Sequence, residues 1–322
     1  MLSIDGLCVS VGTPDRVLDI VRSVSFDIRA GEVLGLVGES GCGKSMTSLA
    51  VMGLLPRPEA WIASGTISLD GVDITGLDPH QRVRKRCAGV SMIFQEPMTS
   101  LNPVVAIGNQ IVEAIRVHDP DVDARLRARD LLDMVRIPDA ELQLNAYPHE
   151  LSGGMRQRVM IAIALACRPR TLIADEPTTA LDVTVQRQIL GLLRELCADL
   201  DMGVLFITHD LGVVSQLADR VAVMYAGALV ETGGVEELFR SPMHPYTFGL
   251  MAAVPRPAER HQRLHPIAGR APKPDEVGEG CPFAPRCFRA EAVCRSGEVP
   301  FDGEGSGHRA RCHFPLRDEV LP

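Results

Sequence analysis

A short glycine-rich stretch, GESGCGKS at residues 38–45, constrains the fold of this chain more than any other feature of its sequence. It directly follows the apolar run VLGLV at residues 33–37, and the segment after it, KSMTSLAVMGLL, is expected to form a helix. In a strand–loop–helix unit of this kind, the backbone N–H groups of the loop and the N-terminus of the helix form a cradle for phosphate anions. The stretch therefore predicts a phosphate-binding loop at the end of a strand.

The loop also meets a specific pattern, G-x-x-x-x-G-K-S/T, at Gly38, Gly43, Lys44 and Ser45. In such a loop Lys44 would reach the β- and γ-phosphates of ATP, and Ser45 would ligate Mg²⁺. The alternative is a glycine-rich turn that matches by chance, which the strand before it and the helix after it disfavour. We expect these residues to bind the nucleotide: Gly38, Glu39, Ser40, Gly41, Cys42, Gly43, Lys44, Ser45 and Met46.

A second apolar strand ends in two carboxylates. The stretch TLIADEP at residues 171–177 places Asp175 and Glu176 directly after four mostly apolar residues. Asp175 is expected to hold Mg²⁺, usually through water, and Glu176 to act as the general base for the attacking water. The alternative is a strand end with two solvated acids.

A third stretch, LSGGMRQR at residues 151–158, precedes the carboxylate strand. Ser152 can cap a helix there, and Gly153 and Gly154 allow the backbone to approach an anion closely. This is a second phosphate-binding helix end in the same chain. One nucleotide can hardly use both ends within one subunit.

With these motifs the chain resembles the ATP-binding cassette (ABC) ATPases over roughly residues 1–240. The resemblance implies that two subunits pack head to tail, so that the helix end at Ser152, Gly153 and Gly154 meets the nucleotide on the other subunit's glycine loop. It also implies an α/β fold, with a RecA-like parallel sheet, an N-terminal antiparallel β portion and a helical subdomain inserted at about residues 96–168.

Three further residues match the family's motifs. The resemblance implies that Gln95, in IFQEP, touches the metal or water and senses the transmembrane partner. It implies that Asp182, in TTALDV, lies at the dimer interface and that His209, in FITHD, contacts the γ-phosphate. One position departs from the pattern, because Val11 stands about where many members stack adenine on an aromatic ring. We therefore expect looser selectivity for the base.

The strand and helix patterns agree with an α/β fold. GTISLDGVDITGL is expected to form a hairpin that turns at Asp70-Gly71. Between the strands TLIAD and GVLFIT, a helix is expected that carries Ile189, Leu193, Leu196 and Leu200 on one face. The ATPase domain is expected to span residues 1–240, followed by an extension at 241–322 that is irregular beyond one helix in HPYTFGLMAAV.

Four of the nine cysteines crowd into this extension, with the spacing C-x5-C-x6-C-x17-C. Four thiolates can hold Zn²⁺ or an iron–sulfur cluster, although structural zinc sites usually use tighter pairs. The extension resembles that of the peptide/nickel importer branch, some members of which carry a four-iron, four-sulfur (4Fe-4S) cluster. A structural cluster is favoured over zinc or free thiols, and its expected ligands are Cys281, Cys287, Cys294 and Cys312.

Composition limits where the chain works. The net charge of −8 and pI of about 5.6 argue against general electrostatic binding of nucleic acid. The longest apolar run, VMIAIALAC at residues 159–167, is far shorter than a membrane span, and the N-terminus lacks a signal-peptide pattern. We therefore expect a cytoplasmic protein that reaches the inner (plasma) membrane as a peripheral subunit.

The resemblance implies the ATPase of a bacterial-type importer, with peptides (di- and oligopeptides) as the favoured solute and nickel or another small solute as the alternative. Its expected partners are a second ABC ATPase subunit (homologous or identical), two transmembrane permeases and an extracytoplasmic solute-binding protein. No nucleic-acid partner is expected.

Two rival classes of function fit the sequence less well. Soluble ABC ATPases of DNA repair insert a long coiled coil before the second glycine motif, whereas here Leu151 lies only 107 positions after Lys44. Soluble ABC proteins of translation carry two cassettes per chain, and this chain carries one. A redox or metal sensor gated by ATP would instead make the cysteine extension its primary site.

Overall fold

A computed structural model of the chain describes residues 1–13, 16–77, 89–94, 100–179, 181–253, 266–302 and 307–316. The chain forms two compact units. Unit 1 comprises Met1–Leu2, Ile28–Val33 and Ser68–Phe206. Unit 2 comprises Ser3–Asp27, Leu34–Ile67 and Ile207–Pro322.

The centre of unit 1 is a set of neighbouring strands in the order β8–β7–β6. β6 (Val90–Ile93) and β7 (Thr171–Asp175) are parallel, with Val90 opposite Thr171. Every residue of β7 and of β8 (Gly203–Thr208) is buried. Such continuous apolar strands are typical of a parallel sheet covered on both faces. The strands predicted over TLIAD and GVLFIT are therefore confirmed.

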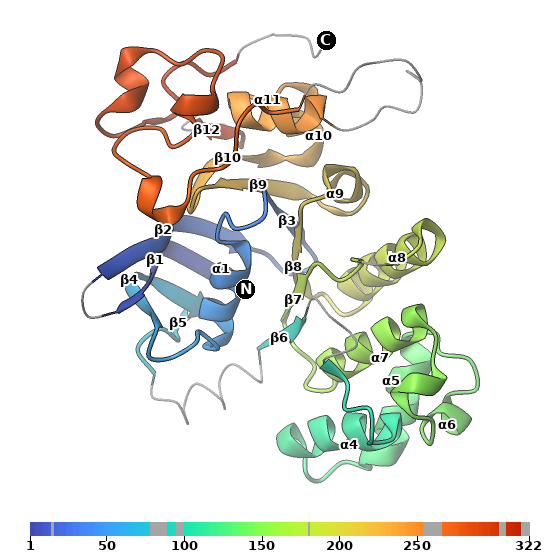
Figure 1. Cartoon of the computed structure of the whole chain (residues 1–322). Helices are drawn as coiled ribbons and strands as arrows, with labels where there is room; N and C mark the ends of the chain where they lie inside the picture. The colour runs from blue at the N-terminus through green and yellow to red at the C-terminus, as the bar shows by residue number, and fades with distance from the viewer. Residues whose placement is uncertain are drawn as a thin grey trace. The chain divides into compact units, whose positions relative to one another are not determined.

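Residues 107–165 of unit 1 are mostly helical, as predicted for this part of the chain, and Figure 1 shows α4 to α7 grouped together. The elements are α4 (Ile107–His118), α5 (Ala124–Met134), α6 (Ala140–Gln143), η1 (Pro148–Glu150) and α7 (Gly153–Leu165).

The helix α8 (Val183–Asp199) of unit 1 largely follows the predicted periodicity. Ile189 and Leu193 are fully buried and Leu196 is 4% exposed. The prediction is wrong for Leu200, which is 44% exposed. The helix ends one residue earlier, and Leu200 is its C-cap, so the helical spacing no longer sets the direction of this side chain.

Unit 2 contains the N-terminal strands in the order β2–β1–β4. These are β1 (Leu2–Thr13), β2 (Arg16–Ile28) and β4 (Ala60–Leu69). The last two residues of β4, Ser68 and Leu69, belong to unit 1 and pair antiparallel with β5 (Val72–Asp73) of that unit. Asp70 and Gly71 form the turn between them with φ of +50° and +78°, so the predicted hairpin is confirmed.

A second run of strands in unit 2 has the order β3–β9–β10–β12–β11. β3 (Val33–Val37) is parallel to β9 (Arg220–Tyr225), and β9 is antiparallel to β10 (Ala228–Gly234). The helices of the unit are α1 (Lys44–Met52), α9 (Leu211–Leu217), α10 (Val235–Arg240) and α11 (Pro245–Ala252). α11 confirms the helix predicted in HPYTFGLMAAV.

The C-terminal extension is less irregular than its composition indicated. It contributes β11 (Phe301–Asp302) and β12 (Arg309–Arg311), and β12 pairs with β10, as Figure 1 shows. The described part of the extension also forms short 3-10 helices: η2 (Pro274–Glu276), η3 (Ala284–Arg286) and η4 (Ala292–Arg295).

A buried carboxylate anchors the extension to β10. Glu231 is fully buried and accepts hydrogen bonds from the backbone N–H groups of Met243 and His244, both at 2.7 Å. His308 Nε2 lies 2.7 Å from the same carboxylate. One side chain of β10 therefore holds both the start of α11 and the segment before β12.

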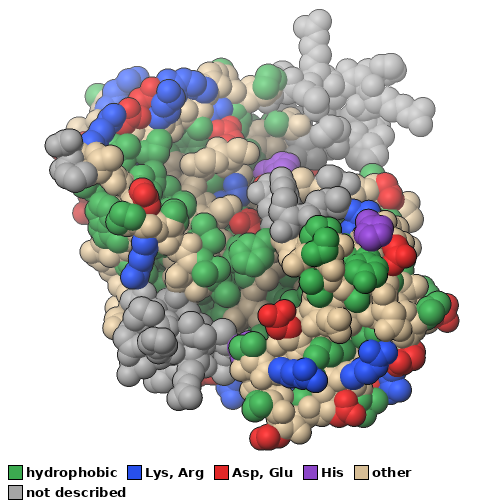
Figure 2. All heavy atoms as spheres, turned by 60° about the horizontal axis from the view of Figure 1, so that its bottom comes forward, with side chains coloured by type: hydrophobic (Ala, Val, Ile, Leu, Met, Phe, Trp, Pro, Cys, Tyr) green, Lys and Arg blue, Asp and Glu red, His purple; other side chains and the backbone are tan. Residues whose placement is uncertain are grey.

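On the face drawn in Figure 2, basic and acidic side chains are interspersed, so no single sign of charge covers that face. Within the described ranges, no helix is both long and apolar enough to cross a membrane.

Candidate nucleotide-binding site

The glycine loop in unit 2 joins β3 to α1, as its pattern predicted. Gly41 and Gly43 have φ of +81° and +106°, a region that favours glycine. A Cβ at Gly38 would collide with the carbonyl oxygen of Met224, and one at Gly43 would lie 2.8 Å from that of Ile20. The loop therefore needs glycine for both its backbone conformation and its close packing.

Lys44 lies along the loop and is only 6% exposed. Its Nζ donates to the carbonyl oxygens of Gly38 and Glu39 at 2.8 and 3.1 Å. Burial raises the pKa of the neighbouring Cys42 thiol, although the Lys44 ammonium opposes that shift. Ser40, Gly41 and Ser45 are exposed, and Met46 is half-buried.

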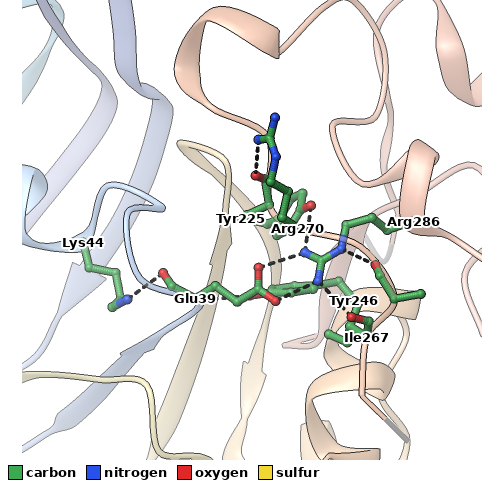
Figure 3. A network of polar contacts seen from close by, with 9 residues as sticks. Glu39, Lys44, Tyr225, Tyr246, Ile267, Arg270 and Arg286 are labelled. Atoms are coloured by element: carbon green, nitrogen blue, oxygen red, sulfur yellow. Dashed lines mark hydrogen bonds and ion pairs between the residues drawn. The ribbon is translucent and has the colours of Figure 1, made fainter.

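The side chain of Glu39 is bound to the C-terminal extension. Both carboxylate oxygens accept from Arg286, at 2.8 and 3.1 Å. The backbone N–H of Glu39 donates to the hydroxyl of Tyr246 at 2.9 Å. Figure 3 shows these side chains converging on the loop. Sequence reasoning missed Arg286 and Tyr246, which lie 247 and 207 positions from Glu39 and belong to no local motif.

The two carboxylates of unit 1 follow β7. Asp175 is its last residue and is 5% exposed. Glu176 has φ of +46°, an uncommon conformation for a residue with a side chain. Its Oε2 accepts a hydrogen bond from Thr179 Oγ1 at 3.0 Å. Backbone conformations of this kind are frequent at functional sites, so the conformation of Glu176 agrees with a place in such a site.

Two capped helix N-termini lie close together in unit 1. Ser152 caps α7, as expected, by accepting from the Met155 N–H at 3.3 Å. Asp182 caps α8 and accepts from the Val185 N–H at 2.9 Å. A Cβ on Gly154 would lie 2.6 Å from a methyl group of Val185. The structure therefore brings the glycine pair at 153–154 near the α8 N-terminus, which sequence spacing alone did not show.

The other candidate residues are distributed as follows. His209 is exposed and follows β8 directly, next to Asp210, which caps α9. Val11 is half-buried in β1. Lys44 and His209 belong to unit 2. Gln95 lies outside the described residues.

All four cysteines of the extension line one pocket in unit 2, together with His244 and His313. Their thiols are free. Burial raises the pKa of Cys312 to about 11 and also raises that of Cys281. Across the described ranges, no group of three or more His, Cys, Asp or Glu residues is arranged to hold a metal ion. The lining cysteines are Cys281, Cys287, Cys294 and Cys312.

Comparison with known families gives two matches. Residues 21–179 match the model of the ABC transporter family. Residues 230–294 match the model of the oligopeptide/dipeptide transporter C-terminal region.

Individual proteins match over most of their length. The chain is 46% identical to the dipeptide transport ATP-binding protein DppD of Escherichia coli, over 100% of this chain and 99% of that protein. It is 50% identical to the oligopeptide transport ATP-binding protein AppD of Bacillus subtilis, over 91% of this chain and 90% of that protein.

Solved structures agree with the fold. The dimeric ATP-binding cassette MJ0796 in a post-hydrolysis state, bound to ADP and Pi, superposes with a TM-score of 0.65 at 25% identity. This superposition covers 73% of this chain and 99% of the MJ0796 chain. The cbiO1 subunit of a Clostridium perfringens ABC transporter complex superposes with a TM-score of 0.63 at 28% identity, over 74% of this chain and 90% of that one.

Proposed function

The chain belongs to the ABC transporter ATP-binding proteins, and on that premise we propose that it hydrolyses ATP to energise the import of di- or oligopeptides. One observation carries the proposal: the 46% identity to a dipeptide transport ATP-binding protein over the full length of this chain. The match to an oligopeptide/dipeptide transporter C-terminal region supports the peptide branch in particular.

The glycine loop would bind the phosphates of ATP through its backbone N–H groups, which its glycines leave accessible. Lys44 would exchange the carbonyl oxygens of Gly38 and Glu39 for phosphate oxygens. A bound Mg²⁺ neutralises charge on the β- and γ-phosphates. Ser45 and Asp175 would supply oxygen ligands of the kind that this ion prefers, and Gln95 is the third proposed contact.

Glu176 would accept the proton of the attacking water. Its hydrogen bond with Thr179 at 3.0 Å fixes the direction of the carboxylate. His209 would stabilise the charge on the γ-phosphate by donating a hydrogen bond to it. Both residues follow the ends of buried strands, so their backbones are held firmly.

A second cassette would complete each site. The capped α7 N-terminus at Ser152, Gly153 and Gly154 offers backbone N–H groups to a phosphate. We assign it to the nucleotide on the partner cassette, with Asp182 at the interface. The dimeric state of the similar cassette MJ0796 supports this arrangement. The partner is a homologous ATPase chain or a second copy of this one.

The membrane-spanning path would come from two permease subunits, with this chain peripheral at the cytoplasmic face of the inner membrane. A solute-binding protein outside the membrane would deliver the peptide. A nickel importer of the same branch is the alternative. Val11, half-buried in β1, would give adenine an apolar contact in place of ring stacking.

We also propose that the extension holds a 4Fe-4S cluster, with zinc as the alternative. The support is that Cys281, Cys287, Cys294 and Cys312 line a single pocket. A bound cluster would supply a covalent cross-link, which a proline-rich segment with few apolar side chains needs.

His244 adds a second reason to expect a cluster or a metal-bound thiolate in this pocket. Its Nδ1 accepts from the Tyr246 N–H at 3.0 Å, and burial lowers the pKa of the ring to about 3. The ring is therefore neutral, with its proton on Nε2. That Nε2 is buried and has no hydrogen-bond partner among the described residues, and His244 is one of the residues that line the pocket. A buried donor needs an acceptor, and thiolate or sulfide sulfur would provide one.

The ATPase assignment is tested by Mg²⁺–ATP binding and hydrolysis with the purified chain and its partner subunits. Lys44→Ala is expected to abolish hydrolysis, whereas Lys273→Ala, on the exposed surface of the extension, leaves it unchanged. An equal loss of ATP hydrolysis in the two variants, or no loss in either, would contradict the assignment.

A further inference from the structure

We propose that the C-terminal extension sets the conformation and charge of the nucleotide-binding loop, with Arg286 and Tyr246 as positioning residues for ATP. The proposal rests on the ATP site assigned above and adds a regulator to it. Its basis is the polar network of Figure 3, all of which lies in unit 2.

Arg286 uses all five of its N–H donors. Its two terminal nitrogens bind the Glu39 carboxylate at 2.8 and 3.1 Å. They also donate to the hydroxyl of Tyr225 at 3.2 Å and to the carbonyl of Ile267 at 3.3 Å. Nε donates to the carbonyl of Ala268 at 2.9 Å. A guanidinium has five N–H groups in a fixed plane, so this site fits arginine and not lysine.

The surroundings of this ion pair make it strong. The Arg286 side chain is only 7% exposed, and its guanidinium carbon lies 5.8 Å from the ring centre of Tyr225. Tyr246 and Phe283 pack against that ring at 4.5 and 5.3 Å. Burial alone would lower the pKa of Arg286, but its hydrogen bonds to Glu39 and Tyr225 raise it above the usual value.

Glu39 is held at three points. Arg286 binds its side chain, the Tyr246 hydroxyl accepts from its N–H, and Lys44 Nζ donates to its carbonyl oxygen. Two of these three contacts come from the extension. Glu39 is thus held by residues 207 and 247 positions away, and Lys44, which would bind phosphate, contacts the same residue.

Charge explains why this matters for ATP. Glu39 places a carboxylate inside a loop that must bind a polyphosphate anion, and like charges repel at such distances. Arg286 neutralises that carboxylate by binding both of its oxygens. Without Arg286, the loop would carry an uncompensated negative charge where the phosphates bind.

The experiment measures the Kd for Mg²⁺–ATP, kcat and KM in the assembled complex, together with the melting temperature. Arg286→Gln is expected to raise the Kd and KM about tenfold, with kcat reduced less than threefold. Arg286→Lys keeps the charge and is expected to recover part of the loss. Glu39→Gln, which removes the carboxylate and leaves the Arg286 cation in place, is expected to raise the Kd less than Arg286→Gln does.

The double variant Glu39→Gln/Arg286→Gln separates charge from folding. Removing the unpaired carboxylate is expected to restore the Kd to within about threefold of wild type. Arg270→Gln is the matched control, because Arg270 forms a similar bidentate pair but is 64% exposed and donates to Glu276 and Ala271 of the extension. Tyr246→Phe is expected to raise the Kd about threefold.

Three results would overturn the inference: an Arg286→Gln Kd equal to that of Arg270→Gln, equal effects of Glu39→Gln and Arg286→Gln, or no recovery in the double variant. If wild-type protein itself fails to bind Mg²⁺–ATP, the proposed function fails instead. If Arg286→Gln does not fold, the Arg286→Lys and Tyr246→Phe variants decide, and a wild-type Kd in both rejects the proposal.

Discussion

The nucleotide-binding loop and the C-terminal extension lie in the same unit, yet they are held in different ways. The loop owes its shape to glycine, since Gly41 and Gly43 adopt positive φ and Gly38 leaves no room for a side chain. The extension owes its shape to buried polar side chains, above all Glu231 and Arg286. Adding atoms to the glycines should therefore disrupt the conformation of the loop, whereas removing buried polar atoms should disrupt the extension.

The largest expected effect is on the loop side. Gly38→Ala adds a methyl group that collides with the carbonyl oxygen of Met224. Displacing the loop should reduce ATP hydrolysis by about 100-fold. Gly41→Ala is the matched variant, because its Cβ would meet no atom within 4 Å, so only backbone strain of about 1–2 kcal/mol opposes it. Hydrolysis rates and circular dichroism of both variants test this, and equal activity in the two contradicts the steric explanation.

On the extension side, Glu231→Ala removes a fully buried carboxylate and leaves the N–H groups of Met243 and His244 without their acceptor. We expect the free energy of unfolding to fall by about 3 kcal/mol, measured by urea denaturation. Glu236→Ala, on the exposed face of α10, should change it by less than about 0.5 kcal/mol. A similar small change in Glu231→Ala would show that this carboxylate is not the anchor.

The smallest expected effect on ATP chemistry concerns the cysteine pocket. Cys287→Ser should remove bound iron and sulfide from anaerobically purified protein while hydrolysis stays within about twofold, because the pocket is proposed to have a structural role. Four iron and four sulfide per wild-type chain would support the cluster. One zinc ion per chain would support the alternative, a zinc site. The absence of both iron and zinc would reject a metal site. If Cys287→Ser instead loses the regulation of its ATPase activity, the alternative function as a redox or metal sensor is favoured.

Much of the fold could be predicted from the sequence because its signals are local. The buried strands β7 and β8, the turn at Asp70-Gly71 and the cap at Ser152 each depend on residues within a few positions of one another. The helix α8 shows the limit of this reasoning. Its periodicity holds through Leu196 and fails at Leu200, where the helix has ended.

The contacts of the extension could not be predicted, since they join residues far apart in the chain. Arg286 is 247 positions from Glu39, and His308 is 77 positions from Glu231. Neither pair belongs to a motif, and the proline-rich composition indicated irregular structure where β11 and β12 extend a sheet. The loop pattern likewise gave no sign that the Glu39 side chain binds Arg286, and the contact of Glu39 with the nucleotide stays a prediction.

The central claim is that ATP hydrolysis by this chain drives peptide import, and uptake by the native host tests it most directly. Wild type is compared with Glu176→Gln, using labelled dipeptides, oligopeptides and nickel ions. We predict that Glu176→Gln, which keeps ATP binding, abolishes peptide uptake and leaves nickel uptake unchanged. Loss of nickel uptake alone, or peptide uptake at the wild-type rate, would contradict the account.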